Sequence, residues 1–132
     1  MKVVTMAVSS RYAGKWPLEQ LALLGKPNTS DPTRWSVGSG DDWIAVSIAD
    51  DVRDDYEPET LEKLIGGAEN PTVYLVEASR EKTIANYIQA VPDMPGIMID
   101  NTHGCIASLQ YYKDFVRLNK NWMYSKEAVQ AA

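Results

Sequence analysis

The chain has 132 residues, 45% of them hydrophobic and 23% charged, with a formal net charge of −5, which suits one globular domain over residues 1–132. The single Cys excludes an internal disulfide, no apolar run approaches the roughly 18 residues of a membrane-spanning helix, and the apolar residues near the N-terminus stop too early for a signal peptide. We therefore expect a cytoplasmic protein that makes no contact with a membrane.

The first half of the chain predicts two strands and two short helices. The apolar segment Lys2–Val8 and the alternating segment Trp43–Ile48 are typical of strands. Helices are expected over Trp16–Gly25 and Pro58–Gly67, each with a Pro in its first turn and Gly at its end. Residues 26–42 are rich in Pro, Ser, Thr and Gly, so we expect a long connection there, a kind of loop that is often functional.

The second half repeats the alternation of strand and helix. Its most regular helix is expected over Ser79–Val91, with Ser79 as the N-cap and apolar residues at positions i, i+3, i+4 and i+7 on one face. This alternation favours an α/β or α+β domain whose central mixed sheet of four to five strands is flanked by helices. The other predicted elements are strands at Thr72–Ala78, Gly96–Asp100 and Trp122–Tyr124 and a helix at Ser108–Leu118.

The segment DNTHGCI (Asp100–Ile106) contains the only His and the only Cys. It allows two main interpretations, besides a third in which the lone His is a binding or pH-sensitive contact. In a catalytic interpretation, His103 lowers the pKa of Cys105 to give a thiolate nucleophile, and Asp100 orients the imidazole. In a structural interpretation, the polar residues form a turn, after which residues 105–107 pair back on residues 97–99. No known nucleophile signature surrounds the Cys, so we favour the turn and predict no catalytic residue.

The sequence does not have the residue patterns of a metal site, a phosphate loop or a nucleic-acid interface. One His and one Cys cannot form a four-ligand structural zinc site, and the Asp-rich segment does not have the EF-hand spacing, so no metal is expected. The GSG sequence at Gly38–Gly40 is followed by two acids and a strand, whereas a phosphate loop leads into a helix. No basic stripe with aromatic residues points to nucleic acid. We therefore predict no cofactor and no nucleic-acid partner.

The negative charge is concentrated in one stretch of the chain. Residues 41–59 contain eight acids and one base, a local charge of −7, which leaves +2 for the remaining residues. Such clustering is either a solvated loop or a surface that attracts a cationic protein, and an aromatic residue within it suits an interface. The residues expected to contact a partner are Asp41, Asp42, Asp50, Asp51, Asp54, Asp55, Tyr56, Glu57 and Trp35.

A small acidic chain with a local anionic patch and no catalytic signature resembles the bacterial immunity proteins that neutralise toxin nuclease domains, including those of contact-dependent growth inhibition. The resemblance implies a non-enzymatic inhibitor that forms a one-to-one complex with a basic toxin domain, in which the acids mimic phosphates or cap the toxin's active site. It also implies an association that slows at high salt. Two alternatives remain: a small enzyme that uses Cys105 and His103, or an accessory subunit of a larger assembly.

Overall fold

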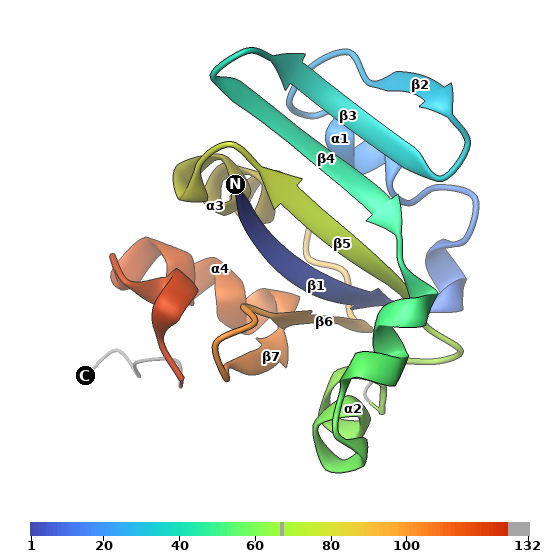
Figure 1. Cartoon of the computed structure of the whole chain (residues 1–132), viewed down its shortest axis with the longest axis vertical. Helices are drawn as coiled ribbons and strands as arrows, with labels where there is room; N and C mark the ends of the chain where they lie inside the picture. Colours follow the sequence, from blue (N-terminus) through green and yellow to red (C-terminus); the bar gives the residue numbers. More distant parts are fainter. Residues whose placement is uncertain (67, 127–132) are drawn as a thin grey trace.

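One antiparallel sheet organises the computed structural model, which describes residues 1–66 and 68–126 (Figure 1). Within these residues the sheet has seven strands in the order β2-β3-β4-β5-β1-β6-β7, and every neighbouring pair is antiparallel. The strands are β1 (Lys2–Val8), β2 (Asn28–Asp31), β3 (Arg34–Ser39), β4 (Asp42–Ile48), β5 (Thr72–Ala78), β6 (Ile97–Asp100) and β7 (Ile106–Ser108).

Helices cover the two faces of the sheet unequally. On one face α1, α3 and α4 pack side by side, whereas α2 lies over β1, β6 and β7 on the other face (Figure 1). The α-helices are α1 (Leu18–Leu21), α2 (Pro58–Ile65), α3 (Glu81–Ala90) and α4 (Leu109–Leu118), and the 3-10 turns are η1 (Ser10–Tyr12), η2 (Asp50–Asp55) and η3 (Trp122–Tyr124). The chain is therefore a single α+β domain.

The first strand lies near the middle of the sheet. It pairs along its whole length with β5, from Lys2 opposite Ala78 to Val8 opposite Thr72, and its second half also pairs with β6. Val4 belongs to the main core beneath α3 and α4, and Ala7, which points to the opposite face, is also fully buried. Burial on both faces explains why β1 is a nearly continuous apolar run in the sequence.

Several sequence predictions are confirmed. The predicted strands at Lys2–Val8 and Thr72–Ala78 have these bounds in the structure. The hairpin between residues 97–99 and 105–107 is present, with Ile99 opposite Ala107. The predicted inner face of α3 is buried without exception: Ile84, Tyr87, Ile88 and Val91.

The prediction for the sheet was wrong in two respects. In the described part of the chain the sheet has seven strands where four to five were expected, and its pairs are all antiparallel where a mixed sheet was expected. Two of the additional strands, β2 and β3, lie within residues 26–42, which were predicted to be a connection. This segment is at the edge of the sheet, where β2 is exposed along its length, so its composition is as polar as that of a loop.

Three predictions for individual elements were also wrong. Of the helix expected over Trp16–Gly25, only α1 is helical, because the residues before and after α1 form turns. Ser79 is not an N-cap: Arg80 occupies that position, and the Ser79 hydroxyl instead accepts a hydrogen bond from Trp43 N at 3.1 Å. The segment Trp122–Tyr124 is the 3-10 turn η3 and not a strand, because its first two side chains are buried against the core and cannot alternate between two faces.

Candidate functional site

The acidic stretch begins with a residue that has a structural role. Ala49 N donates a hydrogen bond to Val73 O at 2.8 Å, which fixes the start of η2 against β5. Asp50 Oδ1 accepts hydrogen bonds from Val73 N at 2.9 Å and from Arg53 Nη2 at 3.3 Å. Arg53 in turn donates to the carbonyl oxygen of Pro71. Asp50 therefore holds the turn in place and is only partly available to a partner.

The carboxylates that follow have no such role. We call the exposed residues Asp51, Asp54, Asp55, Glu57 and Glu59 the acidic patch. Over residues 1–66 and 68–126, none of these five forms an ion pair or a side-chain hydrogen bond, whereas Asp50 is paired with Arg53. Asp51 and Asp54 are three residues apart in a 3-10 turn, so their side chains lie on the same side. The patch is a compact, unneutralised anionic surface.

The structure does not bring Asp41 and Asp42 into the acidic patch. They lie at the turn between β3 and β4, and η2 follows the opposite end of β4. A seven-residue strand spans about 20 Å, so the two groups of acids are at opposite edges of the molecule. Asp42 Oδ1 also accepts a hydrogen bond from Thr83 Oγ1 at 2.8 Å, which ties it to the start of α3.

Trp35, in contrast, lies toward the end of β4 that leads into η2. It is half-buried on β3 opposite Val46, and Thr33 O accepts a hydrogen bond from Ile48 N at 2.9 Å. The chain reaches Asp50 only two residues after Ile48. We call the hollow of about 360 Å³ at this place the aromatic cleft. Its principal lining residues are Tyr12, Trp16, Trp35 and Tyr74, with Pro32 and Ile48 at the rim.

The sequence analysis did not identify Tyr12, Trp16 or Tyr74 as site residues. They lie in η1, in the turn before α1 and in β5, and no spacing in the sequence indicates that these segments converge. In the structure the rings of Trp16 and Tyr74 are 6.2 Å apart between centroids. Burial, and to a lesser extent the charge of Asp50, raise the pKa of the Tyr74 hydroxyl, which places this carboxylate near the aromatic cleft.

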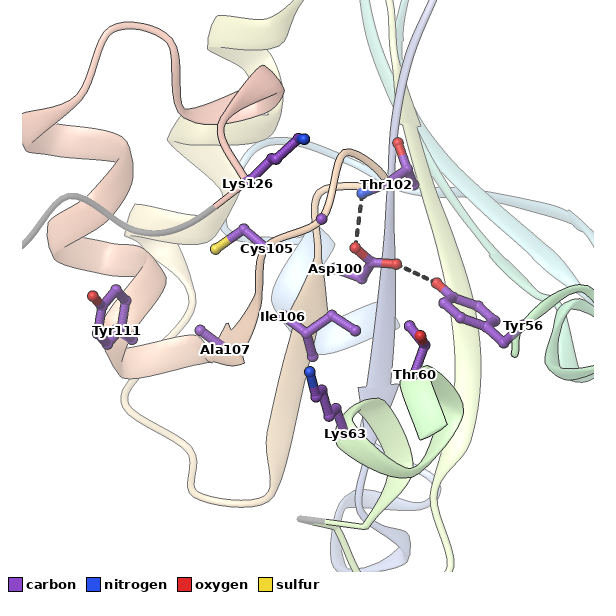
Figure 2. Close-up of a pocket in the computed structure, with 11 residues that line it drawn as sticks. Tyr56, Thr60, Lys63, Asp100, Thr102, Cys105, Ile106, Ala107, Tyr111 and Lys126 are labelled. Carbon is purple, nitrogen blue, oxygen red and sulfur yellow. Dashed lines mark hydrogen bonds between the residues drawn. The ribbon is translucent and has the colours of Figure 1, made fainter. Parts of the chain in front are cut away.

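Tyr56 points into a second hollow, a groove of about 780 Å³ between α2 and the start of β7 (Figure 2). Its hydroxyl donates a hydrogen bond to Asp100 Oδ2 at 2.5 Å, and Asp100 Oδ1 accepts one from Thr102 N at 2.9 Å. Burial and the bond to Asp100 raise the pKa of Tyr56. Thr60 and Lys63 of α2 line the same groove. The Tyr56 hydroxyl thus has an internal partner that the sequence did not predict.

The segment around His103 and Cys105 is a turn organised by Asn101. The Asn101 side chain is buried, and its Oδ1 accepts hydrogen bonds from His103 N at 2.9 Å and Cys105 N at 3.1 Å. His103 is exposed, with Nδ1 3.1 Å from Asn101 O and its ring edge-on to Tyr124. The Cys105 side chain is 4% exposed and lies at the groove (Figure 2). The turn that the sequence predicted is therefore present, and its Asn101 hydrogen bonds are a feature of the structure.

Among the described residues, no group of three or more His, Cys, Asp or Glu side chains is arranged to hold a metal ion. None of the described helices has the length and apolar character that crossing a bilayer demands. Comparisons of the chain with protein-family models, with curated proteins and with solved structures found no significant match.

Proposed function

We propose that this protein is a non-enzymatic inhibitor that captures a basic protein through the acidic patch, as an immunity protein captures a cationic toxin domain. The observation that carries the proposal is the presence of five exposed carboxylates within nine residues, none of them ion-paired in the described part of the chain. Like charges so close together repel one another and lower the stability of the fold, a cost that a cationic partner would offset.

The structure also provides a rigid support for the patch. Its first half is a 3-10 turn anchored to β5 by main-chain and Asp50 hydrogen bonds, and its second half is the first turn of α2, whose Leu64 is fully buried. A surface that is already ordered loses little conformational entropy on binding, which favours a stable complex. The carboxylates attract a basic surface from a distance and so increase the rate of encounter.

The test is capture of a partner from the native source with immobilised protein at low and at high salt. We expect one stoichiometric basic protein at low salt, and much less of it with the variant Asp51→Asn/Asp54→Asn/Asp55→Asn. A matched control removes three carboxylates elsewhere, in the variant Glu19→Gln/Asp41→Asn/Asp93→Asn, whose three side chains are all exposed. This control has the same net charge as the first variant and should capture as much as the wild type.

Two outcomes would contradict the proposal. Absence of any basic partner at either salt concentration would leave the patch as a solvated loop. Equal loss of the partner in both triple variants would show that only net charge matters and that η2 is not the contact surface.

A further inference from the structure

The aromatic cleft has the composition of a site for a single side chain. Four aromatic residues line a hollow of about 360 Å³. Trp16 and Tyr74 form its buried wall, at 5% and 7% exposure, whereas Ile48 at the rim is 42% exposed. Buried aromatic walls within an exposed apolar rim are typical of the pockets that receive an anchor residue at protein interfaces.

The charge that acts on Tyr74 in the aromatic cleft is that of Asp50, which is itself paired with Arg53. In the described part of the chain no charged side chain lines it, and Arg11 and Lys15, which belong to the segment that forms one wall, are exposed and do not line it. Asp50 lies close enough to Tyr74 to raise the pKa of its hydroxyl. The faces of Trp and Tyr rings attract cations, and Arg in particular stacks on them through its planar guanidinium.

The aromatic cleft and the acidic patch are both near the end of β4, where Ile48 is followed by η2. Ile48 at the rim is separated from Asp51 by two residues, and Asp50 joins β5 at Val73, next to Tyr74. We propose that the aromatic cleft receives an arginine side chain of the basic partner, stacked between Trp16, Trp35 and Tyr74, while the acidic patch engages neighbouring cations of the same partner. This inference rests on the proposed function and specifies how the partner is anchored.

The first test uses the wild-type protein and a small probe, and it needs no partner. N-acetyl-arginine methylamide is titrated into the protein while the indole N–H resonances of its four Trp residues are followed by NMR. We expect saturable shifts of Trp16 and Trp35, with a dissociation constant on the order of 1–10 mM. Trp43 and Trp122 serve as internal controls and should not shift, because neither lines the aromatic cleft.

Further probes identify the occupant. N-acetyl-norleucine methylamide has an unbranched apolar chain and no charge, and it should bind at least threefold more weakly if the aromatic rings select a cation. Equal or tighter binding of the norleucine probe would show an apolar anchor site and overturn the inference. A shift of Trp35 with protein concentration alone would assign the aromatic cleft to a second copy of the chain, which also overturns it. Absence of a saturable shift with the arginine probe would also overturn the inference.

The second test uses the captured basic protein and separates this inference from the proposed function. Trp35→Leu should weaken the complex at least tenfold, whereas Trp43→Leu, at the far end of the same hairpin, should change it less than twofold. If Trp35→Leu binds as well as the wild type while the acidic triple variant does not, the role of the aromatic cleft is refuted and the proposed function stands. If no basic protein is captured, the proposed function fails and the titration with the arginine probe still decides the specificity of the aromatic cleft.

Discussion

Asn101 makes four hydrogen bonds from a fully buried side chain, and this residue determines the structure of the turn that contains His103 and Cys105. Its Oδ1 accepts two main-chain N–H groups of the turn, and its Nδ2 donates to Trp122 O and Ser125 O, both at 2.8 Å. The turn and η3 are thereby joined through one amide group. A sequence pattern rich in Asp, Asn, Thr and Gly predicts the turn, but it does not show that the amide reaches a segment some twenty residues further along.

We expect Asn101→Ala to lower the free energy of unfolding by about 2–4 kcal/mol, because it leaves several buried donors and acceptors without partners. Urea unfolding measures this change. Asn86→Ala is the matched control, since Asn86 is exposed on α3 and makes no side-chain hydrogen bond in the described structure; its free energy of unfolding should change by less than about 0.5 kcal/mol. Equal losses in the two variants would show that the Asn101 network contributes nothing.

The Tyr56 hydroxyl bonded to Asp100 makes stability depend on pH in the alkaline range. Burial and Asp100 raise the pKa of Tyr56 above the usual value of about 10, so the folded protein keeps a proton that the unfolded chain loses. This contribution to stability is complete below about pH 10 and decreases as the pH rises above that value. We expect Tyr56→Phe to cost about 1–3 kcal/mol at neutral pH.

The same variant should also lose stability more slowly than the wild type above about pH 10. Denaturant unfolding at several alkaline pH values measures the two slopes. Partial exposure of Tyr56 allows solvent screening to reduce the difference between them. Parallel curves for the two proteins would show that the hydroxyl does not keep its proton in the folded state.

At the scale of elements, the 3-10 turn η2 combines one structural carboxylate with neighbouring carboxylates that have no partner in the described chain. Sequence cannot distinguish them: Asp50, Asp51, Asp54 and Asp55 are the same residue type in the same segment. Only the position of β5 shows that Asp50 meets a main-chain N–H while Asp51 faces solvent. The grouping of the acids was therefore predictable, whereas their division into structural and available residues required the tertiary structure.

This division gives a paired prediction. Asp50→Ala should lower the free energy of unfolding by about 0.5–1.5 kcal/mol, because it removes the acceptor for Val73 N and the ion pair with Arg53. Asp51→Ala should leave the free energy of unfolding unchanged or raise it slightly, since it relieves repulsion. Thermal and urea unfolding of the two variants under the same conditions measure both effects. A larger loss for Asp51→Ala would refute the assignment.

At the scale of the whole molecule, the periodicity of apolar residues predicted the buried strands and helices well, whereas it missed β2 and β3 at one edge of the sheet. The strand β1 and the inner face of α3 have clear apolar patterns because their side chains are buried in the core. Strand β2 has a polar sequence because solvent reaches it along its length, so nothing local distinguishes it from a loop. In β3, Trp35 and Val37 stand at alternate positions and pack against the core, a short strand pattern that the sequence analysis missed. Because these strands were not predicted, the sequence could not show that the turn between β3 and β4 holds Asp41 and Asp42 at the end of β4 away from η2.

The most direct test of the central claim, that the acidic patch engages a basic protein, is the association rate constant with the captured partner as a function of salt. For the wild type we expect the rate to fall at least tenfold between about 20 mM and 500 mM salt, because exposed charges are screened within a few ångströms at the higher concentration. For Asp51→Asn/Asp54→Asn/Asp55→Asn we expect a slower rate that depends only weakly on salt. Equal rates and equal salt dependence in the two proteins would contradict the claim that the acidic patch is the surface of encounter.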